Sequence, residues 1–146
     1  MSLFGAISIS ASGMDAQRTR AETITENLAN ADTTRTPQGG AYRRKDAVFS
    51  SIPLGGTFAD ALSEISGGGA PEGVAVSQIV VDDSEPERRY LPGHPDADPQ
   101  GYVAFPKINP AEEMVDLMSA SRGYQANVAA ISAVKDMINR SIDLFR

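Results

Sequence analysis

The sequence predicts a mainly α chain in which two long terminal helices pair as a coiled coil and flank a small β-rich middle domain. Apolar residues recur at heptad spacing near both ends of the 146-residue chain, which is typical of paired helices. The thirteen glycines and nine prolines concentrate between these ends, together with the clearest β-branched run. We therefore divide the chain into an N-terminal helix 1–34, a middle domain 35–106 and a C-terminal helix 107–146.

The first predicted helix covers residues 3–31 and carries a narrow heptad stripe. The stripe consists of Leu3, Ile7, Ser10, Met14, Gln17, Ala21, Ile24, Leu28 and Ala31. Because several of these side chains are small or polar, the stripe permits close helix approach but buries a modest area. The residues here for which we predict packing between subunits are Ile7, Met14, Ile24, Leu28 and Asn30.

The middle domain holds three predicted strands and one flexible excursion. Residues 42–50 have a strand pattern, residues 74–81 are apolar and β-branched, and residues 102–105 follow Gly101 as a third strand. Residues 51–73 are rich in glycine, which favours a flexible excursion with a short helix over 58–65. The proline-rich, charged residues 84–100 are expected to form a loop.

The second predicted helix, over residues 111–145, has the stronger pattern. Asn109 and Pro110 are a start signal, and Glu112, Glu113 and Asp116 place negative charge near the positive helix end. A helix of about 50 Å, at 1.5 Å per residue, needs a partner along its length. We predict packing between subunits for the apolar members of its heptad stripe. These are Met114, Leu117, Tyr124, Val128, Ile131, Ile138, Ile142 and Phe145.

Composition excludes several classes of protein. The net charge of −6 and pI near 4.7 argue against a nucleic-acid binder, which usually shows a basic face. No run of 18 apolar residues occurs, so no membrane span is expected. The start of the chain lacks the basic and apolar blocks of a cleaved secretory signal, so any export is expected to use another route.

The polar motifs of the middle domain do not indicate catalysis. The single histidine, His94, lies in a proline-rich loop with no evident nucleophile beside it. Asp96, Asp98 and Gly101 faintly suggest a calcium loop, but the position that needs a bidentate glutamate is Lys107. We expect solvated loop acids here, and therefore no enzyme activity, no cofactor and no metal site.

A short basic run, Arg43-Arg44-Lys45, stands out in this acidic chain. It is too isolated to indicate nucleic-acid binding. We predict instead that these three cations form electrostatic contacts between subunits.

Four stretches together resemble a known family. Residues 26–34 are similar to the N-terminal signature of bacterial flagellar rod, hook and related axial proteins. Residues 35–45, 92–103 and 109–127, taken in order, narrow the resemblance to the proximal-rod members of that family. The resemblance covers nearly all of the chain except residues 51–73.

This resemblance implies a structural, self-assembling rod subunit with an inner coiled-coil layer and a small outer β domain. It implies that the subunit transmits motor torque in the periplasmic rod of the flagellar basal body, and that it leaves the cytoplasm through the flagellar type III export apparatus. The implied partners are copies of itself, other rod proteins and the export-gate junction protein at the rod base.

Two other classes of function stay open from the residues alone. A soluble helical adaptor would use the C-terminal helix to fill a groove on one partner and would form no polymer. An enzyme would need an acidic site around Asp96 and Asp98, for which no activated group can be named.

Overall fold

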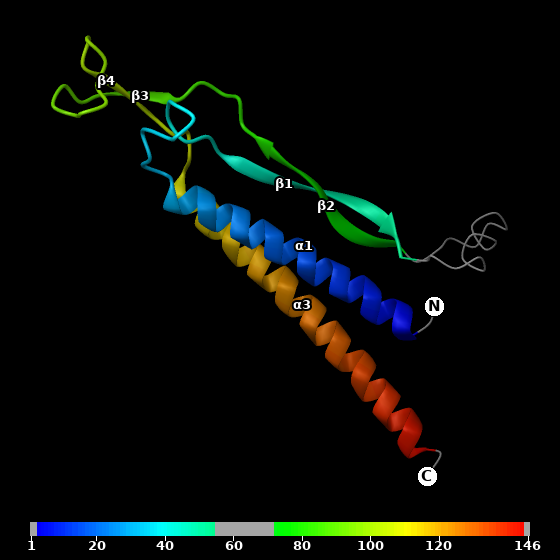
Figure 1. Cartoon of the computed structure of the whole chain (residues 1–146). Helices are drawn as coiled ribbons and strands as arrows, with labels where there is room; N and C mark the ends of the chain where they lie inside the picture. The colour runs from blue at the N-terminus through cyan, green and yellow to red at the C-terminus, as the bar shows by residue number, and fades with distance from the viewer. Residues whose placement is uncertain (1–2, 55–71, 145–146) are drawn as a thin grey trace.

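The computed structural model describes residues 3–54 and 72–144, which form two long helices joined by two small antiparallel sheets (Figure 1). The elements are α1 (Leu3–Ala29), β1 (Lys45–Pro53), β2 (Glu72–Val81), β3 (Glu87–Tyr90), β4 (Tyr102–Phe105) and α3 (Pro110–Asp143). Long terminal helices and a small β region between them are thus confirmed. The predicted short helix 58–65 and Phe145 lie outside the described residues.

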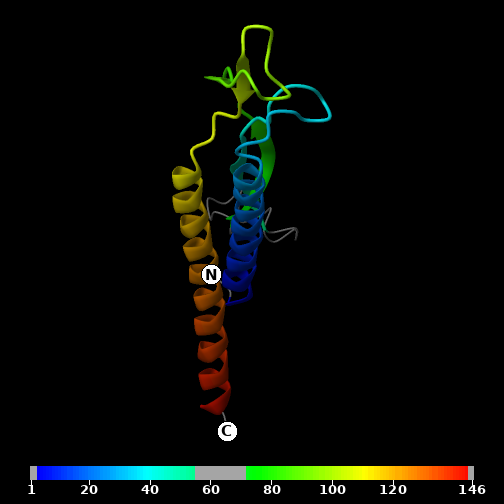
Figure 2. The same ribbon diagram turned by 90° about the vertical axis from the view of Figure 1, so that its left-hand side faces the viewer.

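The helix α1 lies between α3 on one side and the β1–β2 hairpin on the other (Figures 1 and 2). The two helices run antiparallel, because Gly13 of α1 faces Asn127 of α3 while Gln17 faces Gly123. On its other side α1 binds the hairpin, where the Ser12 hydroxyl accepts a hydrogen bond of 3.1 Å from the Val74 amide. Among the described residues, the backbones of β1 and β2 do not come close to α3.

The hairpin pairs β1 with β2 from Lys45 opposite Val81 to Pro53 opposite Glu72, with an irregularity between Val48 and Phe49. Both ends of segment 51–73, which we expected to be flexible, are therefore paired strand residues. Strand pairing is a long-range effect that local glycine content does not reveal.

The second sheet, β3 with β4, lies beyond the end of the helix pair, at the upper left of Figure 1. Strand β4 was predicted, but β3 falls inside residues 84–100, and the prediction of a loop was wrong there. The charged sequence of β3 has no strand pattern of its own. It is stabilised by its partner, through a Tyr90–Tyr102 edge contact at 5.4 Å and Arg89 over the Phe105 ring at 4.8 Å.

The start of α3 follows the predicted signal. The Asn109 side chain accepts a hydrogen bond from the Ala111 amide, Pro110 begins the helix, and Glu112 and Glu113 lie in the first turn. In the part of the chain that the structure covers, neither long helix has a stretch apolar enough to cross a membrane.

Candidate assembly surfaces

The face of α3 that packs on α1 consists of small and polar residues. Glu113, Ala120 and Val134 are its buried members, and Gly123 and Asn127 between them are half-buried. They recur close to every third and fourth position, so they form one stripe along the helix. The contact between the two helices is therefore close but buries few large apolar side chains.

Two glycines allow this close approach. A Cβ atom added at Gly13 would lie 2.8 Å from the Asn127 amide nitrogen, and one added at Gly123 would lie 3.1 Å from Cδ of Gln17. Each helix thus contributes one glycine that receives an amide side chain from the other helix. The Gln17 side-chain oxygen is buried and has no hydrogen-bond partner among the described residues.

The apolar stripe predicted on α3 lies mostly outside this contact. Met114 is 53% exposed and Ile142 62% exposed, and Tyr124 and Val128 are also exposed. Three other members of the stripe are half-buried at the edge of the α1 contact. They are Leu117, Ile131 and Ile138.

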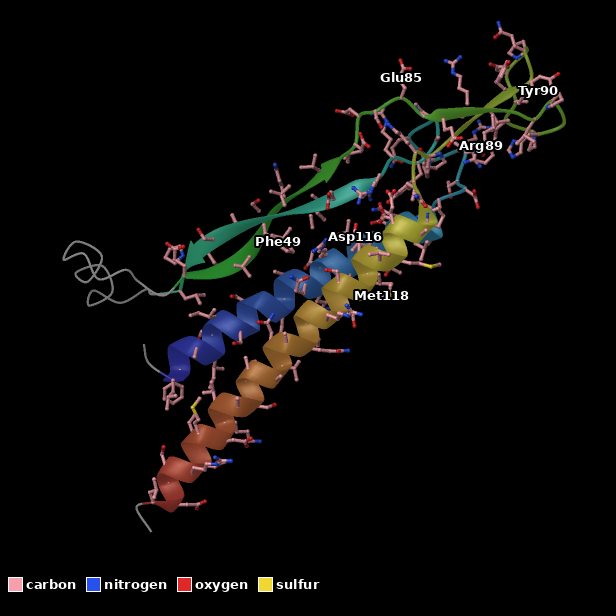
Figure 3. All side chains as sticks on the ribbon, turned by 180° about the vertical axis from the view of Figure 1, so that it is seen from behind. Phe49, Glu85, Arg89, Tyr90, Asp116 and Met118 are labelled. Carbon is pink, nitrogen blue, oxygen red and sulfur yellow. The ribbon has the colours of Figure 1, made fainter. Side chains whose placement is uncertain are left out.

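The exposed part of this stripe continues onto neighbouring apolar side chains. Met118 is 54% exposed, and Figure 3 shows it on the opposite side of α3 from Asp116. A groove of about 930 Å³ runs between the two helices beside it, with Leu117 and Tyr124 on one wall and Ala21 and Thr25 on the other. We call the exposed residues Met114, Met118, Tyr124 and Val128 the open face of α3.

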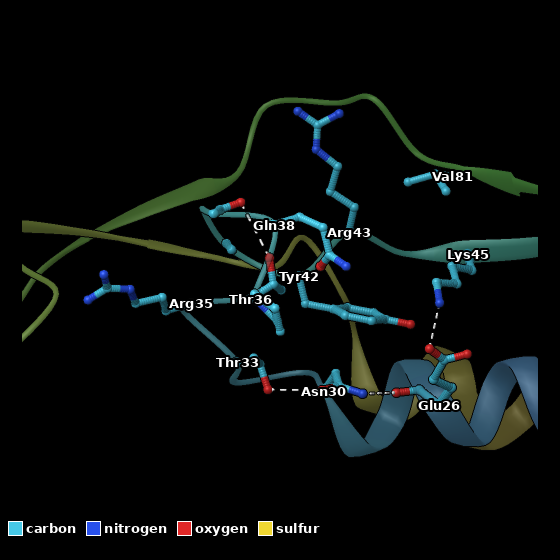
Figure 4. Close-up of a pocket in the computed structure, with 13 residues that line it drawn as sticks. Glu26, Asn30, Thr33, Arg35, Thr36, Gln38, Tyr42, Arg43, Lys45 and Val81 are labelled. Carbon is cyan, nitrogen blue, oxygen red and sulfur yellow. Dashed lines mark hydrogen bonds and ion pairs between the residues drawn. The ribbon is translucent and has the colours of Figure 1, made fainter.

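The predicted residues of α1 are covered to a larger extent than those of α3. Ile24 is buried, and Ile7, Met14 and Leu28 are half-buried. Asn30 closes the end of α1: its amide donates to the Glu26 carbonyl at 2.9 Å, and its oxygen accepts from the Thr33 hydroxyl at 3.1 Å (Figure 4). Whether these residues also pack between subunits stays a prediction.

A buried polar junction connects both helices with the start of β1. Asn27 is fully buried, and its side-chain oxygen accepts from the Lys45 amide at 2.9 Å and from the Tyr42 hydroxyl at 3.1 Å. Its amide nitrogen donates to the Lys45 carbonyl at 2.8 Å and to the Glu113 carboxylate at 3.2 Å. Asn27 therefore fixes the hairpin and α3 to α1 simultaneously.

The charged half of this junction is an ion pair. Glu113 is 1% exposed, and its carboxylate accepts a hydrogen bond of 2.6 Å from Nε of Arg44. This hydrogen bond raises the pKa of Arg44 above its usual value. Asp116 lies one turn further along α3, within 3.8 Å of Arg44 and 3.4 Å of Arg20. We call Asn27, Arg44 and Glu113 the polar hub.

Burial also perturbs the tyrosine of the junction. Desolvation, with a smaller contribution from the carboxylates of Glu26 and Glu113, raises the pKa of Tyr42 to about 12. The Tyr42 hydroxyl is therefore a stable hydrogen-bond donor to Asn27 at physiological pH.

The three cations of the basic run all have carboxylate partners within the chain. Arg43 pairs with Asp83 at 2.6 Å, Arg44 with Glu113, and Lys45 with Glu26 at 2.5 Å. Arg43 and Lys45, with Glu26, line a hollow of about 600 Å³ at the end of α1 (Figure 4). An additional electrostatic contact with another subunit stays a prediction for them.

Comparisons with known proteins cover the whole chain. Residues 7–35 match the family model described as flagella basal body rod protein, and residues 100–144 match the C-terminal model of the flagellar basal body rod FlgEFG proteins. The flagellar basal-body rod protein FlgC of Bacillus subtilis is 43% identical over 150 residues, which cover 99% of both chains. The FlgC proteins of Borreliella burgdorferi and Salmonella typhimurium are 38% and 37% identical over nearly their full lengths.

The chain belongs to the FlgC family of flagellar basal-body rod proteins. The resemblance to flagellar axial proteins is thereby confirmed, and within it the resemblance to rod subunits. Members of the FlgC family are structural subunits of the basal-body rod, and this chain is one of them rather than an enzyme.

The loop acids of this FlgC-family chain accept hydrogen bonds from within the chain. Asp96 accepts a hydrogen bond of 2.8 Å from the Thr34 hydroxyl, and Asp98 accepts from the amides of Gln100 and Tyr102. His94 accepts from the Asp96 amide at 3.1 Å. Across residues 3–54 and 72–144 no cluster of histidine and acidic side chains has the arrangement of a metal site.

Sequence reasoning missed the polar hub. Asn27 lies within the signature at residues 26–34 but was not selected, and Glu113 was assigned only to the helix dipole. These two residues are 86 positions apart, so no local pattern relates them. A polar residue between the apolar stripe positions Ile24 and Leu28 was the one available signal.

Proposed function

We propose that this FlgC-family chain assembles into the proximal part of the rod and there transmits motor torque across the periplasm. In this proposal α1 and α3 form a coiled coil whose outer surface packs on helices of neighbouring rod subunits. The partners are copies of the chain, other rod proteins and the junction protein at the export gate. The chain reaches them through the flagellar type III export apparatus without a cleaved signal peptide.

The observation that carries this proposal is the open face of α3. Large apolar side chains on a helix normally point into a core, yet Met114, Met118, Tyr124 and Val128 are all more than a third exposed. Contiguous exposed apolar residues indicate an interaction site, and burying them stabilises a contact by about 25 cal/mol for each Å². Such contacts can extend along the whole helix pair, and contacts of this length would resist twisting of one subunit against the next.

The geometry of assembly supports an open polymer. The open face borders the α1-facing stripe of α3 but is exposed, so a neighbouring subunit can cover it without displacing α1. Contacts that join unlike surfaces of successive subunits generate a helical filament when the rotation between subunits does not close a ring.

The test is a double substitution on the open face, Met114→Asp with Val128→Asp. Both side chains are exposed in the chain, so we expect unchanged helix content by circular dichroism and normal accumulation of the protein. We expect loss of motility, with basal bodies that stop before the rod is complete. The matched control, Met114→Leu with Val128→Ile, keeps both positions apolar, and cells that carry it should swim.

If cells with the Asp variant build normal rods and swim, the open face is not an assembly surface. One-to-one complexes with a single partner and no polymer would instead support the helical adaptor.

A further inference from the structure

The polar hub satisfies every hydrogen-bonding atom of one buried side chain. The carboxamide of Asn27 offers two donor hydrogens and two acceptor lone pairs, and all four are used by Tyr42, by Lys45 (twice) and by Glu113. Glu113 uses its second oxygen for Arg44. The helices α1 and α3 and residues 42–45 can form this set of hydrogen bonds at only one relative position.

Outside the hub, sliding along the helix axis is opposed mainly by the close contacts of Gly13 with Asn127 and of Gly123 with Gln17. The α3 side of the contact offers alanine, glycine and asparagine between Glu113 and Val134, so sliding the helices changes the buried apolar area only slightly. A slip of one heptad would bring Ala120 opposite Asn27, so the buried Asn27 amide would lose the Glu113 carboxylate as its partner. Buried polar groups that lose their partners are costly, so such a slip is opposed at the hub.

We propose that Asn27, Arg44 and Glu113 determine the register of α3 against α1, and thereby the surface that neighbouring subunits recognise. A single buried polar residue is known to fix register in coiled coils whose apolar residues alone do not. The groove beside the open face has one wall from each helix, so its shape depends directly on the register. This consequence for recognition rests on the proposed function, whereas the register itself rests on the fold.

The experiment measures the register in the isolated full-length chain by distance between two spin labels. The chain contains no cysteine, so Ser8→Cys on α1 and Ser119→Cys on α3, both exposed, would carry the only labels. A slip of one heptad changes the separation along the axis by about 10 Å, since each residue rises 1.5 Å. Such a change is well resolved by pulsed electron paramagnetic resonance.

Two variants are compared in this labelled background. The hub variant, Asn27→Leu with Arg44→Met and Glu113→Leu, replaces the polar hub by apolar side chains. The seam variant, Gln17→Ala with Asn127→Ala, removes the amide side chains that lie over Gly123 and Gly13 and leaves the hub intact. Circular dichroism reports the helix content of each.

We expect a single distance between the two spin labels in the parent chain and in the seam variant. The hub variant should keep its helices and show an additional distance shifted by about 10 Å, because slipped registers become accessible. A single parental distance in the hub variant would overturn the proposal, as would a broad distribution in the seam variant or in the parent. If the hub variant does not fold, the seam variant decides: one distance supports the hub, and several contradict it. Because no polymer is involved, failure here leaves the proposed function standing.

Discussion

At the scale of single residues, the chain depends on a few polar and small side chains rather than on a large apolar core. Asn27 and Glu113 are among the most deeply buried side chains of the described residues, and both are polar. Glycine at positions 13 and 123 leaves room for a neighbouring amide side chain, which lies 2.8 Å and 3.1 Å from the place of a Cβ atom. Substitutions at these positions therefore act on specific contacts.

Tyr42 makes the stability of the chain sensitive to alkaline pH. Its pKa is about 12 in the folded chain against an ordinary value of 10, so the stability it contributes is complete below pH 10. This stability is lost as the pH rises from 10 towards 12, because the unfolded chain releases the proton more readily. We expect urea unfolding between pH 9 and 12 to show a steeper loss for the parent chain than for Tyr42→Phe. Equal slopes would contradict the buried hydroxyl.

Gly13 and Gly5 form a matched pair of helix glycines. Replacing glycine by alanine inside a helix stabilises it by about 1 kcal/mol, and at Gly5 nothing within 4 Å opposes the added methyl. At Gly13 the added methyl carbon would lie 2.8 Å from the side-chain nitrogen of Asn127. We expect Gly5→Ala to raise the melting temperature, and Gly13→Ala to lower it or leave it unchanged. A similar rise in both variants would mean that the helices approach less closely than described.

At the scale of elements, the two helices follow from local signals, and α3 shows this most clearly. It begins where the side-chain oxygen of Asn109 accepts a hydrogen bond from the Ala111 amide, and Glu112 and Glu113 place negative charge in its first turn. The same start places Glu113 in the hub, so the cap positions a residue of the junction as well as beginning the helix.

The N-cap gives a prediction at this scale. Asn109→Ala removes the side-chain acceptor and should lower the free energy of unfolding by about 1 kcal/mol. Asn109→Asp keeps an acceptor and should stay close to the parent chain. Chemical denaturation of the three proteins measures both effects, and an unaffected Ala variant would show that the cap does not stabilise α3.

What the sequence reveals of these elements follows from the range of the interactions. Residues 3–31 and 111–145 were predicted as helices and β2 as a strand because spacing and caps are local. Strand β3 and the polar hub were not found, since β3 is stabilised by β4 and Asn27 by residues far along the chain. The heptad stripe of α3 was identified, but spacing alone does not tell which partner it faces. The structure leaves most of that stripe exposed, next to a narrower stripe that packs on α1.

At the scale of the whole molecule, the described residues form a narrow, elongated body (Figures 1 and 2) in which few large apolar side chains are buried. The helix α1 contacts both α3 and the hairpin, and the hub at its C-terminal end joins all three. A chain of this shape has much surface for its volume, and the open face of α3 is an apolar part of that surface. These features suit a subunit that completes its packing by assembly.

The most direct test of the open face compares the reactivity of one introduced cysteine in two states. Val128→Cys carries the only thiol of the chain and lies on the open face, so a maleimide should label it readily in the isolated protein. In purified basal bodies we expect the same thiol to be protected at least tenfold, while Glu85→Cys on the exposed loop before β3 serves as the comparison position. Equal labelling of Val128→Cys in the isolated chain and in the basal body would show that the open face stays in solvent, and would contradict its role in assembly.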